Sequence, residues 1–192
     1  MGRLTAASLR RIVGRSGYEM IDTFVETGTA NGELTEIVAV EFDRVHAIEL
    51  DPVHVAMTKQ RLVERVERVG KCEHVTVYTG DSREVLPRVI DQLPKAAFFF
   101  LDAHYCRLDP PIAKSEFPLW VELELVKARG LADIVAVDDM HTFGKKRDEL
   151  RYEPGKPEWE GVTGKSLLRF FGKRVVAHDA IDDAFVMWLG WV

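Results

Sequence analysis

A short apolar strand followed by a glycine-containing turn occupies residues 23–32, which read Thr-Phe-Val-Glu-Thr-Gly-Thr-Ala-Asn-Gly. The residues from Glu33 to about Asp43 have a helical pattern, so this stretch predicts a strand, a tight turn and the start of a helix. Such a unit begins many ligand-binding α/β sheets, where the ligand lies against the helix N-terminus. The turn contains Gly28 and Gly32 but lacks the third glycine of the dinucleotide-binding fingerprint, which argues against a pyrophosphate ligand.

Short apolar runs alternate with helix-period segments along most of the remaining chain, as expected for βαβ units. Further strands are predicted at residues 45–48, 75–78, 96–101, 134–137, 174–177 and 185–189, and helices at 4–16, 51–70, after Asp81 and at 117–129. Too few residues separate the last two strands for a crossover helix, so we expect an antiparallel hairpin there. The predicted fold class is α/β, with a Rossmann-like, doubly wound, mostly parallel seven-stranded sheet and an antiparallel C-terminal hairpin strand.

The length and composition favour one globular domain over residues 1–192. The chain has 192 residues, of which 46% are hydrophobic and 30% charged, values that exclude an intrinsically disordered protein. Two stretches interrupt the βαβ pattern, near residues 106–118 and 144–165, and both follow the carboxyl ends of central strands. We interpret them either as substrate lids or as solvated surface insertions. Trp159 in the second is either a stacking surface for a substrate or a packing residue.

The charge and cysteine content restrict the partners and the compartment. The net charge of −5 argues against a nucleic-acid partner, although Lys145-Lys146-Arg147 would suit a local phosphate contact. The two cysteines do not form a disulfide framework, and the N-terminal residues do not resemble a signal peptide. No stretch is apolar enough to span a membrane. We therefore expect a cytoplasmic protein without a membrane partner, and the sequence leaves oligomerisation open.

Two acidic residues at predicted strand ends point to the kind of ligand. Glu26 stands at the mouth of the first turn, where a carboxylate repels phosphate and attracts a ligand with positive charge. Glu49 ends the second strand, the position from which an acidic residue accepts hydrogen bonds from ribose hydroxyls. A solvated strand end is the alternative for Glu49, and turn geometry alone is the alternative for Gly28 and Gly32.

Three motifs carry a family resemblance: residues 26–32, then Ala47-Ile48-Glu49-Leu50, then Gly80-Asp81-Ser82. In this order they resemble the cofactor motifs of class I S-adenosylmethionine-dependent methyltransferases. The resemblance implies that Glu26 lies near the methionine amine, that Glu49 holds the ribose, and that Asp81 and Ser82 face the adenine. The cofactor-binding residues that it implies are Glu26, Thr27, Gly28, Gly32, Glu49, Leu50, Asp81, Ser82 and Asp102. For Asp81 the alternative is a helix N-cap alone.

An acidic cluster is predicted where the fourth and fifth strands end. Asp102 ends one strand, and Asp138 and Asp139 end the other. Neighbouring strands lie about 4.8 Å apart, so these carboxylates can converge at one sheet edge, where a cation would relieve their repulsion. Oxygen ligands favour Mg²⁺, Ca²⁺ or Mn²⁺. Consecutive strand residues point to opposite faces, so the chain must turn at Asp138 and Asp139 for both to bind one ion.

This arrangement is similar to the metal-dependent small-molecule O-methyltransferases of the macrocin type. The resemblance implies Asp102, Asp138 and Asp139 as metal ligands, with Mg²⁺ the expected ion, and a catalytic site around Asp102 and His104. The chain departs from the macrocin pattern at His104, where that pattern has an acidic residue. His104 is therefore a candidate general base or a loop histidine bonded to backbone, and His141 is a weaker candidate.

The sequence thus predicts an S-adenosylmethionine-dependent, divalent-metal-assisted O-methyltransferase acting on a small hydroxylated molecule. In the expected reaction a base removes a proton from the substrate oxygen, which then attacks the sulfonium methyl group in line. Two alternatives stay open. One is an NAD-dependent oxidoreductase, which Glu26 and the absent glycine disfavour, and the other is a cofactor-binding methyltransferase-like subunit without catalysis.

Overall fold

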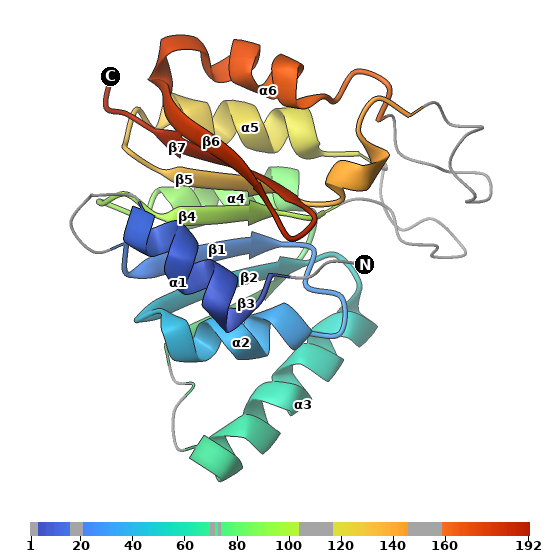
Figure 1. The fold of residues 1–192 in the computed structure, drawn as a ribbon. Coiled ribbons are helices and arrows are strands. Elements are labelled where there is room, and N and C mark those ends of the chain that lie inside the picture. Colours follow the sequence, from blue (N-terminus) through green and yellow to red (C-terminus); the bar gives the residue numbers. More distant parts are fainter. Residues whose placement is uncertain (1–3, 16–20, 70–71, 73, 104–116, 146–158) are drawn as a thin grey trace.

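The computed structural model describes residues 4–15, 21–69, 72, 74–103, 117–145 and 159–192. Seven strands form one sheet in the order β3-β2-β1-β4-β5-β7-β6 (Figure 1). They are β1 (Thr23–Thr27), β2 (Arg44–Glu49), β3 (Val75–Thr79), β4 (Phe98–Leu101), β5 (Ile134–Val137), β6 (Val175–Ile181) and β7 (Ala184–Leu189). The first five strands are parallel, and β7 is antiparallel to both β5 and β6. The predicted doubly wound sheet with an antiparallel C-terminal hairpin is confirmed.

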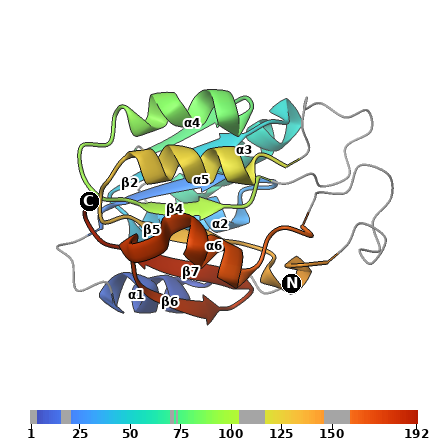
Figure 2. The ribbon, with the colours of Figure 1, turned by 90° about the horizontal axis from the view of Figure 1, so that it is seen from above.

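Helices cover both faces of this sheet. They are α1 (Ala6–Arg15), α2 (Glu33–Glu41), α3 (Pro52–Val69), α4 (Ser82–Ile90), α5 (Leu119–Ala128) and α6 (Gly164–Phe171), with short 3₁₀ turns η1 (Met140–Thr142) and η2 (Gly172–Arg174). In Figure 1, α1 and α2 lie in front of the sheet and α4 and α5 behind it; Figure 2 gives the same two layers from above. None of the described helices is long and apolar enough to cross a membrane.

The two faces of the central strands divide the core. Alternate residues of β4 serve opposite layers: Phe98 and Phe100 pack with α1 and α2, whereas Phe99 and Leu101 pack with α4, α5 and α6. All four side chains are buried, as expected for a parallel strand with helices on both sides. The same alternation in β1 sends Glu26 toward α2 and Thr27 toward α4 and α5.

The carboxyl ends of the parallel strands lie at one edge of the sheet, on the right in Figure 1. Backbone pairing continues one residue past the strands at this edge. The amide of Asp102 donates to the carbonyl of Thr27 (3.0 Å), and the amide of Asp138 donates to the carbonyl of Leu101 (3.2 Å). The strand register therefore places the residues that follow β1, β4 and β5 next to one another.

Helix α6 differs from the sequence expectation, which left residues 144–165 as an insertion and predicted no helix after it. Its start is a capping box: the Thr163 hydroxyl accepts from the Ser166 amide, and the Ser166 hydroxyl accepts from the Thr163 amide. Leu167 and Phe171 then enter the core on one face of the helix. The end of the predicted insertion is therefore regular structure.

A buried ion pair joins the loops at the opposite edge of the sheet. The Arg129 guanidinium donates to the Asp133 carboxylate (3.0 Å), with side chains only 3% and 0% exposed. Asp133 also accepts from the Ala97 amide (2.9 Å), and Arg129 also donates to the Lys95 carbonyl (2.7 Å). Burial raises the pKa of Asp133, although the hydrogen bonds from Arg129 lower it. The pair therefore fixes the entries to β4 and β5.

Asp133→Ala is expected to lower the free energy of unfolding by about 3–5 kcal/mol, because it leaves the Arg129 cation buried without its carboxylate. Urea unfolding followed by circular dichroism measures this loss. Glu124→Ala on the exposed side of α5 is the matched control and should change stability by no more than about 0.5 kcal/mol. Equal effects of the two substitutions would contradict the role given to the buried pair.

Candidate functional site

Two glycines in the turn after β1 lie in close contact with other segments of the protein. A Cβ on Gly28, whose φ is +80°, would lie 2.4 Å from the carbonyl oxygen of Asp102. A Cβ on Gly32, whose φ is +74°, would lie 2.7 Å from the Thr58 hydroxyl on α3. Both glycines are thus required by backbone conformation and by contacts within the protein. Their proximity to a cofactor stays a prediction.

Glu49 is placed by backbone amides at the end of β2. Its Oε2 accepts from the Ala30 amide in the first turn (2.9 Å), and its Oε1 accepts from the Asp51 amide before α3 (2.9 Å). The residue is 7% exposed, so it is not the solvated strand end that was the alternative. An ionised carboxylate has about four acceptor positions, so the two oxygens keep capacity for further donors. Leu50 follows it and is half-buried.

Glu26 and Thr27 lie on opposite faces of β1. The Glu26 carboxylate is buried and accepts from the Thr35 hydroxyl of α2 (2.6 Å). Thr27 is fully buried on the other face, toward Glu122 of α5. The sequence assigned both residues to the cofactor, and that assignment stays a prediction for each of them.

Asp81 and Ser82 begin α4 at the end of β3. The Asp81 carboxylate is the N-cap of the helix and accepts from the Arg83 amide (3.0 Å). It also accepts from the Arg83 guanidinium, Nε at 2.9 Å and the second bond through Nη2. Ser82 is buried and faces Glu122. The capping role predicted as the alternative for Asp81 is therefore real, and a role toward adenine remains a prediction.

The acidic residues after β4 and β5 lie at neighbouring positions, because their backbones pair with the adjacent strands. Asp102, Asp138 and Asp139 are all partly exposed. Asp139 has a φ of +54°, so the chain turns between Asp138 and Asp139, as the metal hypothesis required. Carboxylate oxygens suit a hard divalent cation, but among the described residues the ligand atoms of these three do not all lie within 4.8 Å of one another, so a shared ion stays a prediction.

A second group of ligating side chains lies beside them. Among the described residues, Asp139, His141 and Asp183 have ligand atoms within 4.8 Å of one another, and neither Asp102 nor Asp138 belongs to this group. His141 Nδ1 lies 2.5 Å from Asp183 Oδ2, and the His141 amide donates to Asp183 Oδ1 (3.0 Å). Asp183 comes from the turn between β6 and β7, so the hairpin supplies a residue that the sequence analysis missed.

His104 and most of the predicted lids lie outside the described residues. The borders of the second stretch are joined, because the Gly144 amide donates to the carbonyls of Trp159 (3.1 Å) and Val162 (2.7 Å). Trp159 is only 3% exposed and packs against Phe117 and Phe143, with ring centroids 4.8 and 5.6 Å away. The packing interpretation of Trp159 therefore holds, and the stacking interpretation is wrong for the described arrangement.

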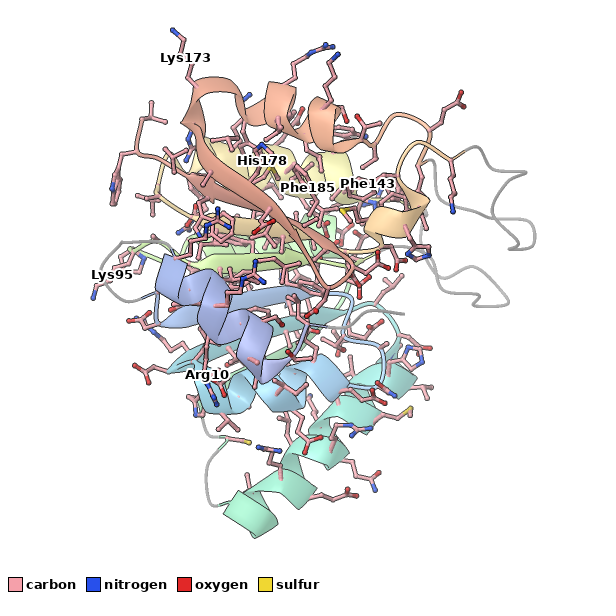
Figure 3. All side chains as sticks on the ribbon, viewed as in Figure 1. Arg10, Lys95, Phe143, Lys173, His178 and Phe185 are labelled. Carbon is pink, nitrogen blue, oxygen red and sulfur yellow. The ribbon has the colours of Figure 1, made fainter. Side chains whose placement is uncertain are left out.

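The aromatic packing continues to the hairpin. Phe143 lies 6.3 Å from Phe185 of β7, and Phe185 stacks at 5.7 Å on His178 of β6, so the three rings form a row (Figure 3). This row connects η1, which carries His141, to the two strands that carry Asp183 at their turn.

Glu122 is the other residue that sequence reasoning missed. It lies in the first turn of α5, is 1% exposed, and faces Ser82 and Thr27. Burial raises its pKa to about 7, and the charges of Asp81 and Asp102 act in the same direction. The position was hidden because an acidic residue in a first helical turn is usually solvated and only favours the helix dipole.

The comparisons with known proteins agree on the fold. No family model matches the chain. A ribosomal RNA small subunit methyltransferase A from Rhodococcus erythropolis is 34% identical over 91 residues, and this match spans 47% of the chain but only 30% of that relative. A protein from Staphylococcus aureus assigned as a caffeoyl-CoA O-methyltransferase superposes with a TM-score of 0.63 at 18% identity, over 99% of this chain and 85% of that one.

An O-methyltransferase from Bacillus cereus, solved with S-adenosylhomocysteine, superposes with a TM-score of 0.58 at 19% identity, over 96% of this chain and 79% of that one. At such identities the superpositions establish the fold. The chain therefore has the class I methyltransferase fold, in agreement with the resemblance of its motifs.

Gly28→Ala is expected to destabilise the protein by about 2 kcal/mol or more, because the new methyl group meets the backbone that follows β4 at a positive φ. Gly14→Ala in α1 is the control, since nothing lies within 4 Å of a Cβ there. It should be neutral or stabilise by up to about 1 kcal/mol through helix propensity. Denaturant unfolding of both variants measures the difference, and a stable Gly28→Ala protein would refute the crowding argument.

Proposed function

We propose that the protein is an S-adenosylmethionine-dependent methyltransferase which methylates an oxygen of a small hydroxylated molecule with the help of a divalent cation. The fold supports the coarser part of this proposal, because ligands of open α/β sheets bind at the carboxyl edge of the strands, near which Glu49, Asp81 and Asp102 lie. The Bacillus cereus protein with this fold was solved with S-adenosylhomocysteine. The metal and the acceptor are inferred from side-chain chemistry.

The observation that carries the proposal is the arrangement of Glu49. Two backbone amides from different segments fix its carboxylate at the junction of β2 with the first turn. A carboxylate fixed in this way can accept from two vicinal hydroxyls without losing side-chain entropy on binding. Vicinal hydroxyls are the feature that a ribose presents, and no phosphate-binding fingerprint accompanies it.

Glu49→Ala is expected to weaken S-adenosylhomocysteine binding by about 1–3 kcal/mol, because the ribose hydroxyls lose their acceptor. Isothermal titration calorimetry measures this change, with NAD as the ligand control. Glu64→Ala on the exposed side of α3 is the control variant and should keep the wild-type affinity. Unchanged affinity in Glu49→Ala would reject the ribose assignment, and binding of NAD by the wild type would favour the oxidoreductase alternative.

The acidic edge supplies residues suited to a cation. Asp102, Asp138 and Asp139 would hold it with carboxylate oxygens, and Mg²⁺ is the ion that such a donor set favours. When bound, the cation lowers the pKa of a coordinated substrate hydroxyl. These residues add charge that also favours a sulfonium cofactor over an anionic one.

His141 is the residue that we assign as general base. Its Nδ1–H donates to Asp183, which fixes the tautomer and leaves Nε2 to accept a proton. In the proposed reaction Nε2 takes the proton of the acceptor hydroxyl. The oxygen forms a bond to the methyl carbon, and the carbon–sulfur bond breaks to leave a neutral thioether. The sequence favoured His104 for this role, and His141 is preferred because its hydrogen-bond partner is identified.

His141→Gln is expected to lower kcat for methyl transfer by about 10²-fold or more while leaving cofactor affinity unchanged. Labelled S-adenosylmethionine and a panel of sugars, polyols and phenols provide the assay, with Mg²⁺ and then with EDTA. His178→Gln is the control, because His178 is an exposed histidine on β6. Full activity of His141→Gln would move the base elsewhere, and full activity in EDTA would remove the metal from the proposal.

A ribosomal RNA acceptor is the second candidate, and the similarity to the Rhodococcus relative favours it. The matched stretch covers less than half of the chain, and the net charge of −5 opposes a broad RNA surface. Adding small-subunit ribosomal RNA to the panel of acceptors in the methyl-transfer assay distinguishes an RNA acceptor from a small-molecule acceptor. Methylation of RNA alone would replace the small-molecule acceptor without changing the cofactor.

A further inference from the structure

Glu122 is an acidic residue at a position that should be apolar. It shares the buried face of α5 with Leu119, Leu123 and Val126, which all belong to one hydrophobic cluster. Burying a carboxyl group costs free energy unless hydrogen bonds or neutralisation compensate it. A leucine would fill this position at no such cost, so the presence of Glu122 calls for a role that packing does not supply.

The surroundings of Glu122 are apolar on one side and polar on the other. It lines a very small pocket with Leu101 and Val137 at the strand ends and with Phe117 and Trp159. On the other side it faces the hydroxyls of Thr27 and Ser82. Both Glu122 Oε1 and Thr27 Oγ1 are buried, and neither has a hydrogen-bond partner of good geometry among the described residues.

The two hydroxyls belong to different cofactor motifs. Thr27 is the last residue of β1 and precedes Gly28, whereas Ser82 is the first residue of α4 and follows Asp81. Glu122 therefore lies between the two segments at the interior of the protein, below the surface on which the cofactor is proposed to lie. A neutral carboxyl group can donate to one hydroxyl and accept from the other, whereas a carboxylate can only accept.

We propose that Glu122 is a positioning residue that, as a neutral carboxylic acid, holds the end of β1 and the start of α4 in the arrangement that binds the cofactor. The inference rests on the proposed function, since it concerns the same cofactor site. Ionisation of Glu122 would place a charge among apolar groups and weaken cofactor binding. Glu122 touches neither the methyl group nor the acceptor in this proposal.

The charges around Glu122 determine the direction of the effect. Burial raises its pKa to about 7, the hydroxyls of Ser82 and Thr27 lower it, and the carboxylates of Asp81 and Asp102 raise it. Arg83 is the cation that interacts with it, and Arg83 is hydrogen-bonded to Asp81. The group is therefore protonated below about pH 7 and charged above it. Cofactor affinity should fall as the pH rises through that value.

The raised pKa of Glu122 also affects the stability of the protein without ligand. The pKa is raised in the folded state, so the folded protein binds a proton at pH values where the unfolded chain has lost it. The free energy of unfolding should therefore decrease as the pH rises from the unfolded value of Glu122 to about 7, and stay lowered above it. The Glu122→Gln variant carries an amide that does not titrate, so it removes this dependence.

Calorimetric titration with S-adenosylhomocysteine in EDTA, at about pH 5.5 and about pH 8.5, tests the proposal in the full chain. The wild-type affinity is expected to fall by about tenfold between these values, beyond the change seen in Glu122→Gln. Glu122→Gln should bind at both pH values as tightly as the wild type does at the lower one. Glu124→Gln, on the exposed side of the same helix, should keep the wild-type pH profile.

The ligand and the histidines titrate in the same way in all variants. Their contribution to the pH dependence of binding therefore cancels when the variants are compared. An identical pH dependence in the wild type and in Glu122→Gln would overturn the inference. Failure of every variant to bind S-adenosylhomocysteine would instead overturn the proposed function, and the inference with it. Thermal unfolding without ligand gives a second measurement: a wild type that gains no stability relative to Glu122→Gln on acidification would also overturn the inference.

Discussion

The contact between Gly28 and the carboxyl end of β4 is the constraint on which the candidate site depends. The first turn comes so close to the carbonyl of Asp102 that no side chain fits between them. Two backbone hydrogen bonds lie beside this contact. The Asp102 amide donates to the Thr27 carbonyl, and the Asp138 amide donates to the Leu101 carbonyl. The acidic residues at the strand ends are therefore placed by main-chain pairing, which is insensitive to the conformations of the side chains themselves.

The fold could be predicted in most of its parts because its signals are local. Apolar runs such as 134–137 ended at polar residues, and the short connection before Ala184 allowed only a hairpin. Helix α6 was missed because it begins at Gly164, a residue that usually interrupts helices. The reciprocal hydrogen bonds of Thr163 and Ser166 offset that cost, and the Thr-x-x-Ser spacing was the signal that could have revealed them.

The position of a candidate site residue could be predicted only where the residue lies at the end of its own strand. Glu49 and Asp102 were identifiable in this way, because the direction of a parallel strand fixes where its last residue lies. Asp183 was not, since its contact with His141 depends on how the hairpin folds back over η1. The sequence also did not reveal why a glycine is required at position 32. The side chain that leaves no room for a Cβ there is Thr58, which comes from another helix.

The acidic residues of the candidate site differ in the groups that contact their side chains. The charge of Asp81, which is proposed to lie near the adenine, is balanced by the Arg83 guanidinium. Glu49, which is proposed to bind the ribose hydroxyls, is held by two backbone amides, and Glu122 stays protonated below about pH 7. The Glu26 carboxylate accepts from the Thr35 hydroxyl at the end where the positively charged amine is proposed to lie. Acidic side chains at these positions favour a cationic ligand over a pyrophosphate.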